Sequence, residues 1–120
     1  MSDYQMGAVE ARFAALIWDS EPVASAELAR EAEALLGWKK STTYTVLKRL
    51  CDKGIFQNVK GTVTARISRE EFHALQSEKF VEDTFEGSLP AFLAAFTKRK
   101  KLTREEVAQL RQMIEDYQEG

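Results

Sequence analysis

The sequence contains one cysteine, one histidine and two prolines among its 120 residues. Cys51 alone cannot form an intrachain disulfide, and Cys51 with His73 cannot supply the four cysteine or histidine ligands of a structural zinc site. We therefore predict no metal and no cofactor. His73 follows Glu70 and Glu71 in a polar stretch, a pattern more typical of a solvated helix face than of a general base.

The sequence also lacks a glycine-rich phosphate-binding loop and any cluster of catalytic residue types, so we predict that the protein is not an enzyme. No apolar run approaches the roughly 20 residues that a membrane-spanning helix requires. The first residues lack the basic and apolar segments of a secretory signal. These absences predict a cytoplasmic protein that does not insert into a membrane.

Positive charge is concentrated in the middle of the chain, although the net charge of the whole is -2. Residues 37–66 carry seven basic side chains against one acidic side chain, a local net charge of +6. Residues 1–36 carry -5 and residues 67–120 carry -3. Electrostatic attraction decays over a Debye length of roughly 8 to 10 Å, so an anionic partner would respond to the local charge of the middle block.

Two helices are predicted before this block. Residues 6–18 place apolar side chains at helical spacing, at Val9, Phe13, Leu16 and Ile17. Pro22 interrupts this helix, and residues 22–24 are a candidate edge strand. A second helix is predicted to begin at a capping Ser25 and to stop at Gly37.

The stretch from Trp38 to Gly54 predicts a third helix with two different faces. A rotation of about 100° per residue places four side chains on the inner face, namely Thr43, Leu47, Leu50 and Cys51. The opposite face carries hydroxyl and basic side chains, namely Ser41, Thr42, Thr45, Lys48 and Arg49, with Tyr44 on its shoulder. Such a face suits the major groove of DNA, because small hydroxyl residues allow close approach and basic residues reach guanine edges or phosphates. Taken alone, a basic helix face is more often simply solvated.

The residues that follow favour the DNA-binding interpretation. Residues 55–59 and 63–67 are rich in β-formers and surround a glycine turn, which predicts a hairpin with Lys60 at its tip. Three helices followed by a hairpin with a basic tip are typical of a winged helix-turn-helix. We predict that residues 1–68 form such a DNA-binding domain.

Three further amphipathic helices are predicted in residues 69–120. Ser68 and Thr103 each precede a glutamate by three residues, which is the pattern of a capping box, and Gly87 and Pro90 separate the first two helices. Helices this short seldom bury so much apolar surface alone. We therefore predict a dimerisation domain, with an intrachain cap on the winged helix as the alternative. The predicted dimerisation residues are Phe80, Phe85, Leu89, Phe92, Leu93, Phe96, Val107, Leu110 and Ile114.

The predicted fold is thus mainly α with a small β-hairpin wing, a winged helix-turn-helix followed by a three-helix dimerisation domain. A homodimer suits double-stranded DNA with an inverted-repeat operator, because two recognition helices related by a twofold axis match a palindrome. Residues 98–101 are all basic and are predicted to be a solvated linker, with a second phosphate contact as the alternative. The competing functional class is a winged-helix protein-interaction adaptor without sequence-specific DNA binding.

The sequence resembles the penicillinase and methicillin-resistance repressors (BlaI/MecI) and their copper-responsive CopY relatives. The resemblance rests on Leu16-Ile17-Trp18, on Trp38 with the run from Ser41 to Gly54, and on residues 85–89 before a Phe- and Leu-rich helix. It implies a dimeric DNA-binding repressor of antibiotic-resistance genes, such as a β-lactamase gene. The family's DNA-contact positions correspond to Ser41, Thr42, Tyr44, Thr45 and Arg49, and its wing tip to Lys60 and Gly61.

Two features of the family have no counterpart here. In β-lactam-responsive members, a membrane sensor-protease pathway leads to cleavage of the repressor at an Asn-Phe bond in the fifth helix. The matching bond in this chain is Ala95-Phe96, so the phenylalanine is present and the asparagine is not. The copper-responsive members carry C-terminal cysteine ligands that this chain lacks.

Overall fold

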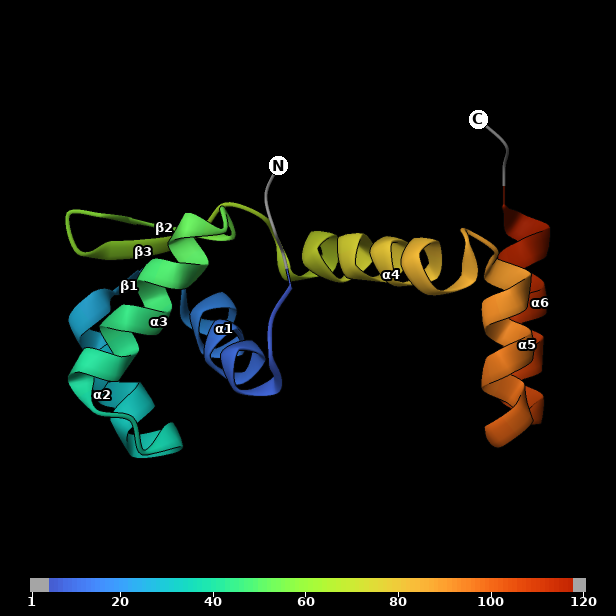
Figure 1. Ribbon diagram of the computed structural model, residues 1–120, viewed down its shortest axis with the longest axis horizontal. Helices are drawn as coiled ribbons and strands as arrows, with labels where there is room; N and C mark the ends of the chain where they lie inside the picture. The colour runs from blue at the N-terminus through green and yellow to red at the C-terminus, as the bar shows by residue number, and fades with distance from the viewer. Residues whose placement is uncertain (1–4, 118–120) are drawn as a thin grey trace. The chain divides into compact units, whose positions relative to one another are not determined.

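The computed structural model describes residues 5–117, and Figure 1 shows its helices and strands. Along the chain these are α1 (Ala8–Ser20), β1 (Val23–Ala24), α2 (Ser25–Leu36), α3 (Lys40–Asp52), β2 (Phe56–Val59), β3 (Thr62–Ala65), α4 (Arg69–Phe85), α5 (Leu89–Arg99) and α6 (Arg104–Asp116). The described residues thus form six helices and one three-stranded antiparallel sheet. This confirms the predicted fold class.

The chain divides into two compact units, Met1–Glu78 and Lys79–Gly120, and the division falls inside α4. The predicted boundary after residue 68 coincides instead with the start of α4. Phe72 explains why the first turns of α4 belong with the first unit, because its side chain is only 3% exposed and joins that unit's core. The ends of the predicted domains, residues 1–4 and 118–120, lie outside the described residues.

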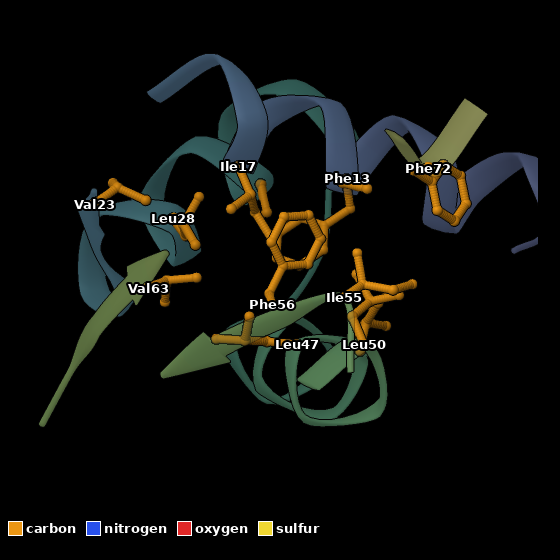
Figure 2. Close-up of a cluster of buried hydrophobic side chains, with 13 residues drawn as sticks. Phe13, Ile17, Val23, Leu28, Leu47, Leu50, Ile55, Phe56, Val63 and Phe72 are labelled. Carbon is orange, nitrogen blue, oxygen red and sulfur yellow. The ribbon is translucent and has the colours of Figure 1, made fainter. Parts of the chain in front are cut away.

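The core of the first unit gathers apolar side chains from all three N-terminal helices, the sheet and α4 (Figure 2). Its largest buried members include Phe13, Ile17, Leu28, Leu47, Leu50, Ile55 and Phe56. Full burial of one such side chain stabilises the fold by roughly 1.5 to 3 kcal/mol. Because α3 contributes two of these side chains, the core fixes which face of α3 points outward.

The sheet places β3 between β1 and β2, with antiparallel pairing on both sides. Val63 pairs with Val23 across one edge, and Val59 pairs with Thr62 next to the hairpin turn. The turn itself is Lys60-Gly61, with φ of 53° and 84°. Positive φ at both central residues is typical of a type I′ turn, whose twist matches that of the flanking strands. The predicted hairpin and the predicted edge strand are confirmed.

Two predicted helix starts are wrong. Ser25 does not cap α2, because Ala24 occupies the N-cap position and the Ser25 amide donates to the Gly61 carbonyl at 2.8 Å. Pairing of β1 with β3 brings the chain directly into α2, which leaves no separate capping residue. Helix α3 spans Lys40–Asp52 rather than residues 38–54. Trp38 lies before it and packs its ring 5.1 Å from the Phe13 ring.

The second unit contains the end of α4 together with α5 and α6. Thr103 and Glu106 form the predicted capping box at the start of α6. Ser88 caps α5 by accepting from the Ala91 amide. Four phenylalanine rings form one cluster, in which the centroids of contacting rings lie 5.7 to 6.0 Å apart. Phe80, Phe85 and Phe92 contact one another, and Phe96 contacts Phe92. None of the side chains of residues 79–117 is fully buried.

Among residues 5–117, no helix is both long and apolar enough to cross a membrane.

Candidate nucleic-acid interface

The inner face of α3 is buried in the first unit. Thr43 and Leu50 are fully buried and Leu47 is nearly so, which confirms their predicted orientation. Val46 is also buried, although the prediction did not place it on this face. Cys51 is only partly buried. The opposite face of α3 is therefore the one that solvent, or a ligand, can reach.

The predicted DNA-contact residues of α3 share that opposite face. Those whose side chains are exposed are Ser41, Thr42, Thr45, Lys48 and Arg49, whereas Tyr44 is partly buried on the shoulder. Among these predicted contact residues, the hydroxyl groups lie toward the start of α3 and the two cations, Lys48 and Arg49, toward its end. Contact of these residues with DNA stays a prediction.

Two exposed side chains on this face make a hydrogen bond or an ion pair within α3. Thr45 Oγ1 donates to the Ser41 carbonyl at 2.9 Å, and Lys48 Nζ lies 3.0 Å from Asp52 Oδ2. Both partners of the Lys48–Asp52 pair are mostly exposed, and such helical pairs contribute only about 0.3 to 0.5 kcal/mol. Lys48 can therefore exchange Asp52 for another anion at little cost.

Arg49 and Lys53 lie beside a carboxylate of another helix. Arg49 Nη1 and Lys53 Nζ are each 3.8 Å from Glu10 Oε2 of α1, and Lys53 Nζ also donates to the Gln5 carbonyl at 2.6 Å. Glu10 Oε2 is shielded from solvent and has no hydrogen bond. Sequence reasoning missed Glu10, since 39 residues separate it from Arg49 and no local pattern joins them. The Arg49 side chain remains 53% exposed, so Glu10 does not enclose it.

The wing lies next to this helix face. Lys60 and Gly61 are exposed at its turn, as expected of a wing tip. The strands behind the turn are joined by a hydrogen bond from Gln57 Nε2 to Thr64 Oγ1 at 3.1 Å. A shallow hollow lies between α3 and β2 and is lined by Tyr44, Leu47, Lys48, Cys51 and Asn58. The outward face of α3 and the first wing strand thus border the same hollow.

The Cys51 thiol in this hollow is poorly suited to nucleophilic chemistry. Burial raises the pKa of Cys51, the nearby Asp52 carboxylate raises it further, and only Lys48 acts in the opposite direction. Because the thiolate is the reactive form, a raised pKa keeps the side chain protonated near neutral pH. Cys51 instead packs from α3 against the core of the first unit.

The predicted dimerisation residues lie in the second unit and differ in exposure. Leu89 and Ile114 are the most open, at 63% and 75%, and Phe80, Leu93, Phe96 and Val107 are also exposed. Phe85, Phe92 and Leu110 are partly buried within the unit. Met113 and Tyr117 are exposed as well, although the prediction did not include them. Ala95 and Phe96, the predicted cleavage positions, both lie exposed in α5.

A three-helix core followed by a two-stranded wing defines a winged helix-turn-helix protein, here extended by a second helical unit. The family model described as penicillinase repressor matches residues 6–116, and the chain belongs to this family. Its members are transcriptional regulators and not enzymes, which confirms both the resemblance and the prediction about catalysis. The family also supports a repressor role for this protein.

Two curated relatives agree with this assignment. The penicillinase repressor of Bacillus licheniformis is 26% identical over 117 residues, which cover 94% of this chain and 91% of that protein. The methicillin resistance regulatory protein MecI of Staphylococcus aureus (strain Mu50 / ATCC 700699) is 19% identical over 115 residues, which cover 92% of this chain and 94% of that protein. Both alignments extend over the winged helix and the C-terminal helices.

Proposed function

We propose that this protein is a dimeric, sequence-specific DNA-binding repressor that occupies an inverted-repeat operator and controls antibiotic-resistance genes of the β-lactamase type. The observation that carries the proposal is the outward face of α3. It presents hydroxyl and basic side chains beside a wing with Lys60 at its tip, in a chain whose remaining charge is negative. A protein that acts on the genome in this way would be cytoplasmic.

The side chains on this face divide into two roles. Thr42, Thr45 and Arg49 are suited to base edges, because threonine can bond a base or contact a thymine methyl and arginine can bond guanine bidentately. Ser41, Tyr44 and Lys48 flank them and are suited to phosphate oxygens. Lys60 and Gly61 of the wing would contact the backbone beside the recognition site, which fixes the register of α3 in the groove.

The second unit would pair two copies of the chain. Its exposed apolar side chains, such as Leu89 and Ile114, are unfavourable in water and would be buried by a second copy. Pairing places two copies of α3 on two half-sites and makes the second binding event intramolecular, which can raise affinity by roughly 10² to 10⁴. Repression would be steric, because the bound dimer occupies DNA that the transcription machinery needs.

Induction would then follow from loss of pairing. In the sensor-protease pathway implied by the family resemblance, the cut falls at the bond that corresponds to Ala95–Phe96 in α5. A cut there would separate the two DNA-binding units. Because alanine replaces the asparagine of the family motif, we expect a protease specific for Asn-Phe to leave this bond intact and to cut an Ala95→Asn variant faster. Equal cleavage of both chains would contradict this expectation.

A mobility-shift titration of the full-length protein on its own upstream region tests DNA binding. We expect a preference for an inverted repeat over a scrambled duplex. Affinity should fall by roughly 10³ or more between 50 and 200 mM salt if six or more phosphates are contacted. A protein-interaction adaptor would show neither the preference nor the steep salt dependence, and that result would overturn the proposal.

A further inference from the structure

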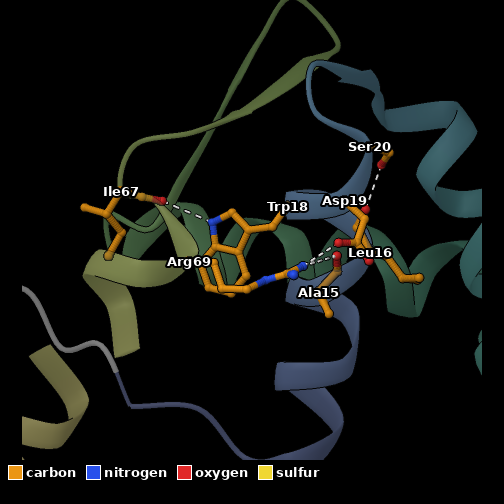
Figure 3. A network of polar contacts seen from close by, with 7 residues as sticks. All are labelled: Ala15, Leu16, Trp18, Asp19, Ser20, Ile67 and Arg69. Carbon is orange, nitrogen blue, oxygen red and sulfur yellow. Dashed lines mark hydrogen bonds and ion pairs between the residues drawn. The ribbon is translucent and has the colours of Figure 1, made fainter. Parts of the chain in front are cut away.

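The first turn of α4 is held against the end of α1 by one arginine (Figure 3). Arg69 Nη2 donates to Asp19 Oδ1 at 2.6 Å and to the Ala15 carbonyl at 3.1 Å. Its guanidinium carbon also lies 5.7 Å from the centroid of the Trp18 ring. These contacts involve a planar, permanently charged group with fixed donor directions, so they restrain orientation as well as distance.

Trp18 connects the same turn to the core. Its Nε1 donates to the Ile67 carbonyl at 3.1 Å, just before α4 begins. Its ring lies 5.4 Å from the Phe72 ring on one side and 5.1 Å from the Phe56 ring of β2 on the other. We call Trp18, Asp19 and Arg69 the α4 clamp. The clamp and Phe72 together attach α4 to α1 and to the sheet.

No other part of α4 is attached to the first unit so firmly. Phe72 is the only buried residue of this helix, and residues 73–85 are exposed or partly buried. The direction in which α4 leaves the winged helix is therefore determined within its first turn. Helix α4 continues without a break from the first unit into the second, so the clamp acts on the element that connects the two units.

The length of α4 amplifies any change at the clamp. A helix of 17 residues is about 25 Å long at 1.5 Å per residue. A tilt of roughly 10° at one end moves the other end by about 4 Å, which exceeds the 3.4 Å rise of one base pair. Loosening the clamp would therefore let two paired DNA-binding units accommodate part of a one-base-pair change in spacing, which combines this shift with a rotation of about 35°.

We propose that the α4 clamp determines the spacing between the two operator half-sites that the dimer accepts. Trp18, Asp19 and Arg69 are then positioning residues, which touch no DNA and select among operators by restraining α4. The inference rests on the proposed dimeric DNA binding, and it adds a specificity determinant far from the base-reading face of α3.

The test compares two charge-neutral double variants of the full-length protein. Asp19→Asn with Arg69→Ala removes the polar contacts of the clamp. Lys79→Ala with Asp83→Asn removes a 3.0 Å ion pair farther along the same helix and serves as the matched control. The probes are an inverted-repeat duplex selected by the wild-type protein from a random library, versions with one central base pair inserted or deleted, and a duplex with a single half-site.

We expect the wild type and the control to lose roughly tenfold or more in affinity on either spacing change, since one base pair is also a rotation of about 35°. The clamp variant should lose about threefold or less, while its single half-site affinity stays within about twofold of wild type. That combination separates a positioning role from damage to the DNA-binding unit. If the double variant does not fold, Trp18→Phe, which removes the bond to Ile67, takes its place.

The inference would be overturned if the folded clamp variant lost as much affinity as the wild type when the half-site spacing is changed. It would also be overturned if the wild type tolerated the changed spacing as well as the clamp variant does. Loss of single half-site binding in the clamp variant would also overturn it, because the residues would then support α3 instead of α4. Failure of the proposed function is distinguishable, since the wild type would then select no inverted repeat at all.

Discussion

Arg49 of α3 lies 3.8 Å from Glu10 of α1, with the guanidinium half exposed and the carboxylate oxygen shielded from solvent. Arg49, the cation proposed to read a base, thus lies beside a carboxylate of α1, which is outside the helix pair α2 and α3. The same oxygen is 3.8 Å from Lys53, so one carboxylate offsets two cations at the end of α3.

Replacing Arg49 by alanine should weaken operator binding by about 1 to 3 kcal/mol and relax base preference at one position of each half-site. The side chain is largely exposed, so the thermal unfolding midpoint should change little. Fluorescence anisotropy against the selected operator and its single-base variants measures both effects. Unchanged affinity in a folded variant would mean that α3 does not read DNA through Arg49.

Replacing Glu10 by glutamine should act in the opposite direction. Removal of the carboxylate frees positive charge on Arg49 and Lys53 for phosphates, so affinity should rise by up to about fivefold, the upper range for partly exposed ion pairs. The plot of log affinity against log salt should steepen, because each added phosphate contact contributes a slope of about -0.9. Glu70→Gln, which neutralises an exposed carboxylate of α4, is the control and should leave the slope unchanged. Weaker binding in Glu10→Gln would show that Glu10 orients Arg49 productively.

Replacing Lys60 by alanine tests the wing. A backbone contact carries no base information, so affinity should fall by a similar factor for operator and scrambled DNA, and the salt slope should decrease by about one. Lys60 has φ of 53° in the hairpin turn, and alanine is poorly suited to that conformation. Lys60→Asn, which also removes the charge but tolerates positive φ, therefore separates the electrostatic effect from turn strain. An unchanged salt slope in Lys60→Asn would remove Lys60 from the interface.

Replacing Ile114 by glutamate tests the pairing surface. The side chain is 75% exposed within one chain, so a charge there should leave the fold of the unit intact and yet disfavour burial against a second copy. Sedimentation equilibrium should show a monomer at concentrations where the wild type is a dimer. Gln112→Lys on the same helix is the control, because it adds a charge without removing an apolar side chain and a lysine can still pair with Asp116, which accepts from Gln112 in the wild type. A variant that remains dimeric would place the interface elsewhere.

Local patterns predicted much of this structure and failed where distant segments meet. Helical periodicity identified Thr43, Leu47 and Leu50 as the inner face of α3, and the glycine turn predicted the wing. Each of these patterns lies within a single helix or hairpin, and packing in the core agrees with it. The contacts of Glu10 with Arg49, and of Asp19 with Arg69, join residues far apart in sequence. No periodicity encodes such pairs, because they depend on how α1 packs against α3 and α4.

The start of α2 illustrates a different limit. Ser25 has the side chain of a good N-cap, yet pairing of β1 with β3 placed Ala24 at that position. The division of the chain inside α4 has a similar cause, since burial of Phe72 joins the first turns of this helix to the winged helix. At the start of α2, tertiary pairing outweighed a capping preference that is worth only about 1 kcal/mol.

The central claim is that two copies of this chain read two half-sites together. Its most direct test is a titration of full-length protein into the selected inverted repeat and into a single half-site, with the mass of each complex measured by light scattering. The account predicts two chains per inverted repeat and binding at least 100-fold tighter than to the half-site, within the range expected for linked binding. One chain per duplex, or equal affinity for both duplexes, would contradict it.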